Sequence, residues 1–179
     1  MINDLANQDW AKVNDKLSAL EKEWSTYEPI SKEEKFSEDH INNFTTDLNN
    51  LKQQIQAKKQ YEASLAANKV TLDTVNFIDL YNPKVPADVG KLDYYGIQVM
   101  LTAEHGDWNQ AEADSQPAID TWNKIKAQVE NINADYAKNF SDTITKMSES
   151  AQKQDVKMTK EFSQKLLYEV DTLESDLKK

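Results

Sequence analysis

The sequence predicts an all-α protein, a bundle of about seven helices built from a duplicated three-helix unit. The 179 residues include only three glycines and four prolines, while Ala, Leu, Lys, Gln, Glu and Asp are abundant, a composition that favours helices. Apolar residues recur at steps of three and four, which places them on one stripe of a helix. All four tryptophans fall in two pairs of equal spacing, which indicates an internal repeat.

The tryptophan pairs mark the first helix of each repeat. The members of each pair are fourteen residues apart, and the pairs are offset by 98: Trp10 with Trp24, and Trp108 with Trp122. Each pair opens with Asp-Trp, and a carboxylate just before a first helical turn accepts hydrogen bonds from its free amides. We therefore predict helices capped by Asp9 and Asp107, with the four indoles as buried structural anchors.

Two further helices are predicted in each repeat. Matching steps of 3, 4, 3, 4 occur at an offset of 96 in Ile41, Phe44, Leu48, Leu51 and Ile55 and in Ala137, Phe140, Ile144, Met147 and Ala151. The fall from 98 to 96 indicates a longer loop around Pro29 to Lys35, since length changes belong in loops. Within that loop, the segment 31–34 has the pattern of a capping box. The third helices are predicted over about 61–81 and 156–177.

The segment between the repeats breaks one helix and forms another. Pro83 and Pro86 cannot continue the preceding helix, because proline lacks an amide donor and forces the residue before it to be extended. The next helix starts at Pro86 or Ala87 and ends at Gly106, a residue suited to a left-handed C-terminal position. Its counterpart in the first repeat is expected to be missing or cut away, with only residues 1–8 in its place. We expect one domain over residues 1–179 with a single interior: repeat 8–81, connecting segment and helix 82–106, and repeat 107–179.

Charge and missing residue types argue against several classes of function. The net charge is −10, and all 21 basic residues are lysine. Without arginine the chain lacks the planar group that binds phosphates at two points, and its negative charge repels nucleic acid. We therefore expect no nucleic-acid partner. Cysteine is absent, which excludes disulfides and thiolate chemistry. There is no run of about eighteen apolar residues and no signal-peptide pattern at residues 1–4.

No catalytic, metal-binding or cofactor-binding pattern emerges, so we predict a protein that is not an enzyme and has neither metal nor cofactor. Di-iron bundles need Glu three residues before His. Those positions hold Ser37 before His40 and Thr102 before His105. Zinc-protease, phosphate-loop and Ser-His-Asp patterns also cannot be assembled from this sequence.

The order of Trp and His resembles that of a small family of bacterial envelope proteins. The resemblance covers about residues 5–80 and lies in Asp9, Trp10, Leu20, Trp24, His40, Leu51, Ile55, Ala63 and Leu72. Members carry an N-terminal membrane anchor or lipoprotein signal before a short helical domain, and no activity is assigned to them. Residues 107–178 resemble a second, diverged copy, with Tyr136 near the position of the family's His. The resemblance implies an extracytoplasmic domain whose anchor lies upstream of Met1. The step Gly106-Asp107-Trp108 is similar to tetratricopeptide-type repeats at the level of fold only.

Two functions remain open from the sequence. The first is a non-enzymatic, lipoprotein-type scaffold or interaction domain of the cell envelope, extracellular and protein-binding. Its partner would be a protein, a peptide or a cell-wall component, and its only link to the membrane would be the anchor. The alternative is a sensor of a small ligand or metal, with a pocket between the two repeats near Tyr94, Tyr95 and His105.

Overall fold

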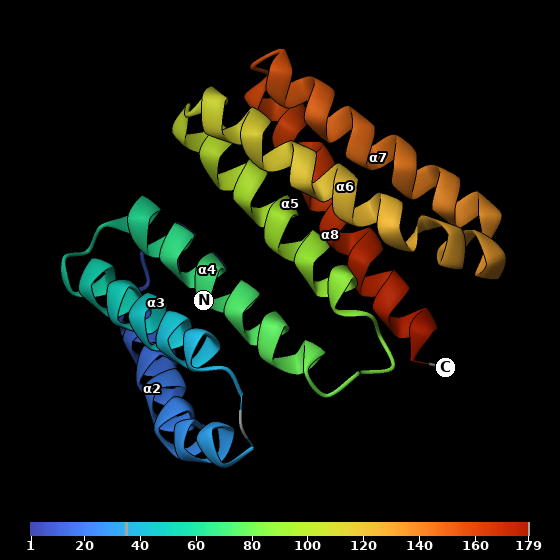
Figure 1. The fold of residues 1–179 in the computed structure, drawn as a ribbon. Helices are drawn as coiled ribbons and strands as arrows, with labels where there is room; N and C mark the ends of the chain where they lie inside the picture. The colour runs from blue at the N-terminus through green and yellow to red at the C-terminus, as the bar shows by residue number, and fades with distance from the viewer. Residues whose placement is uncertain (35, 179) are drawn as a thin grey trace. The chain divides into compact units, whose positions relative to one another are not determined.

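The computed structural model describes residues 1–34 and 36–178, and these form eight α-helices and no strand (Figure 1). The helices are α1 (Ile2–Ala6), α2 (Trp10–Glu33), α3 (Glu38–Gln56), α4 (Gln60–Asp79), α5 (Ala87–His105), α6 (Trp108–Ile132), α7 (Ala134–Gln152) and α8 (Val156–Leu177). The all-α prediction is confirmed. The expected number of about seven helices is too low, because residues that were predicted to contain no helix form the short α1.

The chain divides into two compact units, Met1–Phe77 (unit 1) and Ile78–Lys179 (unit 2). The buried hydrophobic residues correspondingly form two clusters, one within each unit. The described core residues thus form two clusters where a single interior was expected from the sequence. The assignment of residues 1–179 to one domain stays a prediction.

Unit 2 is a four-helix bundle in which α5 packs on α6 and α8, and α7 packs on α6 and α8. An ion pair of 2.6 Å between Lys160 and Glu104 joins the start of α8 to the end of α5, so these two helices run antiparallel. Gly96 is buried where α5 and α8 cross. A Cβ atom at Gly96 would lie 3.2 Å from Leu166 and 3.1 Å from Leu167, which explains why this position of α5 holds no side chain.

Unit 1 contains three long helices, α2, α3 and α4, whose apolar faces share one core. The short α1 packs on α2 and buries Leu5 completely. Ion pairs link neighbouring helices at the surface, with Lys16 2.6 Å from Asp4 of α1 and Lys52 2.7 Å from Glu21 of α2. Such exposed pairs are screened by solvent and contribute little, so the apolar core carries the stability of the unit.

The predicted ends of the helices are largely confirmed. The carboxylates of Asp9 and Asp107 accept hydrogen bonds from the amides of the third residue beyond, as N-caps of α2 and α6. Gly106 ends α5 with a left-handed φ of 83°. Gln8 ends the first segment in the same way with φ 54°. In both turns the following Asp amide donates at 2.9 Å to a carbonyl five residues earlier, so the end of α1 has the geometry of the end of α5.

One aromatic contact recurs in both units. Trp24 packs on Phe44 with ring centroids 4.2 Å apart, and Trp122 packs on Phe140 at 4.2 Å. In each case the indole Nε1 donates to the hydroxyl of the residue that follows the phenylalanine, to Thr45 at 3.2 Å and to Ser141 at 2.9 Å. These contacts match at the offsets of 98 and 96 that the sequence contains.

The expected burial of the indoles holds for only two of the four. Trp24 and Trp122 are 7 % and 2 % exposed. Trp10 and Trp108 begin their helices and are only partly buried against the two cores. A residue in a first turn has fewer neighbours than one in mid-helix, and this explains the difference.

The predicted loop around Pro29 is wrong for most of its length, because α2 continues through Pro29 to Glu33. Proline removes one helical hydrogen bond, but the turn beyond it is held by buried Ser31 and by a Lys32–Glu28 ion pair of 2.6 Å. Ser31 donates to the carbonyl of Glu28 and starts no helix. The capping box proposed there is therefore also wrong. The N-cap of α3 is Ser37, and Lys35 lies outside the described residues.

Candidate functional site

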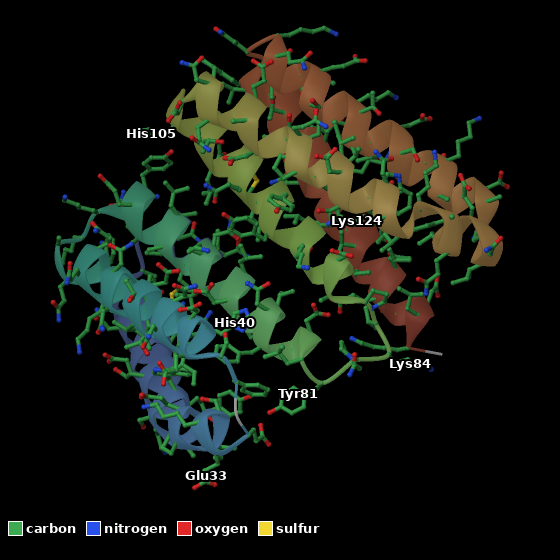
Figure 2. The ribbon with its side chains drawn as sticks, in the orientation of Figure 1. Glu33, His40, Tyr81, Lys84, His105 and Lys124 are labelled. Atoms are coloured by element: carbon green, nitrogen blue, oxygen red, sulfur yellow. The ribbon has the colours of Figure 1, made fainter. Side chains whose placement is uncertain are left out.

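The structure brings together only two of the three residues predicted to bind a ligand. Tyr94 and Tyr95 lie side by side on α5, with ring centroids 5.1 Å apart in an edge-on arrangement, and both are half-buried. His105 is exposed in the last turn of the same helix (Figure 2). Ten residues of helix separate it from Tyr95, which corresponds to about 15 Å along the axis. Tyr95 packs against the core of unit 2, so part of its surface has a structural role.

Unit 1 has an apolar surface hollow of about 270 Å³, here called the aromatic hollow. Its lining residues come from α2, α3 and α4: Leu20, Glu23, Trp24, Tyr27, Phe44, Thr74 and Phe77. Trp24, Phe44 and Phe77 are 5–7 % exposed and form its floor. Leu20 and Tyr27 are half-buried. The hollow therefore presents rings and an aliphatic side chain on a surface whose exposed residues are otherwise mostly polar or charged.

The rings of the aromatic hollow are fixed by contacts with one another. The ring of Phe77 lies 5.7 Å from that of Trp24 and 5.8 Å from that of Phe44, and Tyr27 meets it edge-on at 5.9 Å. Edge-on and tilted pairs at these distances are favourable beyond the area that they bury. The floor of the hollow is therefore held in shape, as binding with little loss of entropy requires.

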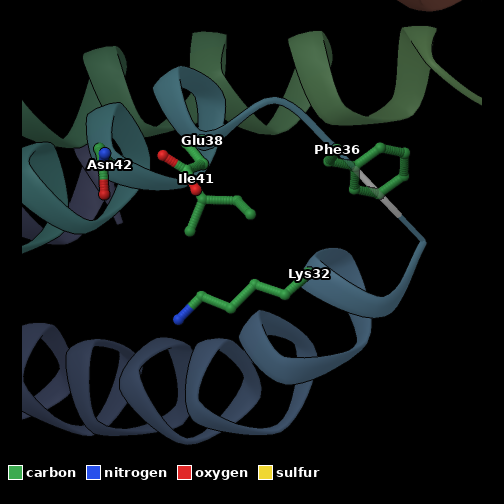
Figure 3. Close-up of a pocket in the computed structure, with 5 residues that line it drawn as sticks. All are labelled: Lys32, Phe36, Glu38, Ile41 and Asn42. Atoms are coloured by element: carbon green, nitrogen blue, oxygen red, sulfur yellow. The ribbon is translucent and has the colours of Figure 1, made fainter.

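A second hollow of about 430 Å³ lies between the end of α2 and the start of α3 (Figure 3). Its lining residues are Lys32, Phe36, Glu38, Ile41 and Asn42. Lys32 approaches from α2, while Glu38 and Asn42 lie on α3. Opposite charges flank an open, mixed surface. The residues that line this hollow do not indicate the chemistry of a particular ligand.

His40, the histidine singled out by the resemblance, lies in the first turn of α3 (Figure 2). Its Nδ1 is 3.0 Å from the hydroxyl of Ser37, and its amide donates to the same oxygen at 3.2 Å. Its ring also lies 6.2 Å from that of Phe77. These contacts give His40 a structural place beside the aromatic hollow, with its ring tilted by 58° to that of Phe77.

Each unit contains one buried carboxylate beside a lysine four residues earlier. In unit 1, Lys69 lies 3.7 Å from Asp73 and 4.0 Å from Asp47. Burial and a hydrogen bond shared with Asp47 raise the pKa of Asp73 to about 6. In unit 2, Lys165 lies 3.5 Å from Glu169. Burial likewise raises the pKa of Glu169.

The buried carboxylate of unit 2 has polar partners on α7. Thr143 donates to Glu169 at 3.2 Å, and the hydroxyl of Tyr136 donates to the backbone carbonyl of the same residue. Burial raises the pKa of Tyr136 above its ordinary value. Among the contacts described above, neither carboxylate meets a histidine, and the one hydroxyl that Glu169 meets, that of Thr143, is completely buried. We interpret both carboxylates as polar links between helices.

A third perturbed carboxylate lies on α5. Burial, together with the negative charges of Asp171 and Glu174 on α8, raises the pKa of Asp93 to about 7. Glu174 is also paired with Lys178 at 3.2 Å. Over the described residues, no group of three or more His, Cys, Asp or Glu side chains has an arrangement that could hold a metal ion. Nor does any described helix combine the length and apolar character needed to span a bilayer.

The aromatic hollow was missed by the sequence reasoning, which treated Trp24 and Phe44 as core. Phe77 lies near the end of the third predicted helix, and no role was assigned to Phe77 or to Tyr27 from the sequence. A stripe of large rings on three successive helices is a weak signal, because the same pattern fills a closed core. Only the three-dimensional arrangement separates a closed core from an open one.

The fold and this surface define a class, an all-helical protein of two small bundles, one of which has an open aromatic face. Comparison with known proteins does not narrow the class. No family model matches the chain, no curated protein is detectably similar to it, and no solved structure matches its fold.

Proposed function

We propose that this chain is a non-enzymatic interaction domain whose working surface is the aromatic hollow of unit 1. One observation carries the proposal: Trp24, Phe44 and Phe77 form a preorganised apolar floor that opens to solvent instead of being closed by a fourth long helix. Aromatic residues are enriched where proteins bind one another. An apolar patch bordered by polar residues commonly marks such a site.

We further propose that the domain acts at the cell envelope, outside the cytoplasm and tethered to the membrane as a lipoprotein-type protein. The support is the resemblance in Asp9, Trp10, Trp24 and His40 to anchored envelope domains. Fractionation of cells that make the full-length protein tests this location. Recovery in the membrane fraction with exposure to added protease agrees with the proposal, and recovery only in the cytosol contradicts it.

Site-specific photocrosslinking in the full-length protein tests the interaction surface. A benzophenone amino acid replaces Tyr27 in the wall of the hollow, and in a matched variant it replaces Thr46, an exposed residue of α3 outside the hollow. The proposal predicts a discrete crosslinked product from position 27 alone. Equal products from both positions, or none from position 27, would contradict it.

A further inference from the structure

The residues that line the aromatic hollow have counterparts in unit 2 at the offsets of the repeated contacts. The offset is 98 for α2 with α6, and 96 for α3 with α7, as the Trp24–Phe44 and Trp122–Phe140 pairs show. An offset of 96 also relates α4 to α8, because the buried carboxylate and lysine of each helix match at that spacing. The counterparts of the lining residues are Ala118, Thr121, Trp122, Ile125, Phe140, Val170 and Leu173.

All seven counterparts are buried in unit 2, with exposures between 0 % and 6 %. All but the buried polar Thr121 belong to the hydrophobic core that α5 completes, since α5 packs on α6 and α8 and buries Val89, Leu92 and Val99 in the same cluster. In unit 1 the same positions line an open hollow, and Glu23 and Thr74 at its rim are exposed. The hollow therefore corresponds to part of the groove between α6 and α8 in which α5 lies, here called the seat of α5.

Unit 1 has only the last turn of such a helix. Leu5 of α1 corresponds to Ala103 of α5, and both are almost completely buried. The turns that follow also have matching hydrogen bonds. With 5 residues, α1 covers about 7 Å of the groove, whereas the 19 residues of α5 cover about 28 Å. About 20 Å of the corresponding seat has no helix from unit 1.

We propose that the aromatic hollow binds one amphipathic α-helix of another protein, seated between α2 and α4 as α5 is seated between α6 and α8. The inference rests on the proposed function and names the partner's chemistry. The bound helix runs antiparallel to both neighbours with its C-terminal end toward α1. It presents aliphatic side chains at the spacing of Val89, Leu92 and Val99, the usual pattern of helix-in-groove recognition.

Two features restrict the partner further. Asp93 of α5 faces Asp171 on α8, and the residue of unit 1 that corresponds to Asp171 is the half-buried Val75. The partner therefore carries an apolar residue at the position that corresponds to Asp93. A second copy of the chain is a poor source, because its own α5 is fixed in the core of unit 2.

Fluorescence anisotropy with a labelled synthetic helix tests the inference. The probe copies residues 86–101 with Asp93→Leu, a scrambled peptide of the same composition is the control, and the protein is the full chain. We expect saturable binding of the probe alone. Thr74→Glu places a charge in the seat and weakens binding at least about tenfold, since burial of an unpaired carboxylate costs more than the corresponding free energy. Thr46→Glu adds the same charge outside the hollow and leaves binding unchanged.

A gain of affinity makes the test independent of any loss of folding. The double substitution Glu23→Thr and Thr74→Val gives unit 1 the residues that unit 2 has at these positions, Thr121 and Val170. The inference predicts tighter binding of the probe by about tenfold, because the rim loses a carboxylate and exchanges one hydroxyl for a methyl group, so less polar surface loses its water on binding. Circular dichroism of each variant verifies the helical content.

Three results would overturn the inference. The first is a lack of saturable binding, and the second is an equal effect of Thr74→Glu and Thr46→Glu. The third is a dimer of the wild-type chain in sedimentation that Thr74→Glu dissociates, which would assign the seat to a second copy. If the peptide does not bind but position 27 gives a specific crosslink, a helical partner is rejected and the proposed function is retained. Failure of both rejects both.

Discussion

Replacement of Asp93 by asparagine is predicted to stabilise unit 2 at high pH and to change little at low pH. Asp93 is half-buried on α5 and faces the carboxylates of Asp171 and Glu174. Its ionised form is unfavourable in the folded protein, because water is partly excluded and both neighbours are negative. Asparagine keeps the shape of the side chain and removes its charge.

The sign and size of the effect follow from the pKa of Asp93, which rises from 3.8 to about 7 on folding. Above pH 3.8 the unfolded chain releases this proton while the folded chain keeps it, so the free energy of unfolding falls as pH rises. The fall continues to about pH 7 and then levels off. A shift of roughly three pKa units corresponds to about 4 kcal/mol, the upper limit for the gain from Asp93→Asn above pH 7.

Urea denaturation read by pulsed hydrogen exchange is the suitable assay, because peptides from α5 report on unit 2 alone. At pH 8 the midpoint for Asp93→Asn should rise by up to about 2 M urea, given a typical slope of about 2 kcal/mol per molar. At pH 4 the wild type and the variant should coincide. Asp142→Asn, an exposed position on α7, is the matched control. A gain of the same size at pH 4 and pH 8 would refute the reasoning.

Three further outcomes are expected. The pKa of Asp73 is raised to about 6, so the wild type should lose up to about 3 kcal/mol of the free energy of unfolding of unit 1 between pH 4 and pH 6. Asp73→Asn should remove this loss, and the α4 peptides of the variant should therefore exchange more slowly than those of the wild type at pH 7. Gly106→Ala should cost about 1 kcal/mol and lower the melting temperature by a few degrees, since φ is 83° there. Trp122→Phe should cost about 1–2 kcal/mol in urea titrations, because the hydrogen bond to Ser141 is lost; an unchanged midpoint would show that the indole nitrogen contributes nothing.

Local signals in the sequence predicted most of the helices. Asp9 and Asp107 cap helices as their positions before Trp indicated, and Gly106 ends α5 as its conformational freedom indicated. These features depend on a few neighbouring residues, so the sequence is sufficient to predict them. The recurring steps of three and four likewise located the buried residues of α3 and α7, from Ile41 to Ile55 and from Ala137 to Ala151.

Features set by tertiary packing were not predicted. Pro29 is a loop signal by its own chemistry, yet the helix continues because Ser31 beyond it is buried. Asp73 and Asp93 read as ordinary charged residues of a helix surface, and only the facing helix reveals their surroundings. The short α1 was missed because five residues carry too little periodicity to be recognised.

Besides the missing long helix, the two units differ in a few side chains around similar floors. Trp24 and Phe44 repeat the stacking of Trp122 and Phe140, so the aromatic floor is common to both. At the rim, Glu23 and Thr74 stand where unit 2 has Thr121 and Val170. A permanently covered seat has no need of a charged rim, and a seat that exchanges its occupant needs polar groups that water can solvate when it is empty. On the proposed function, the polar rim of unit 1 lowers the affinity for a helix and keeps the free hollow compatible with water, and this is why restoring the residues of unit 2 should tighten binding.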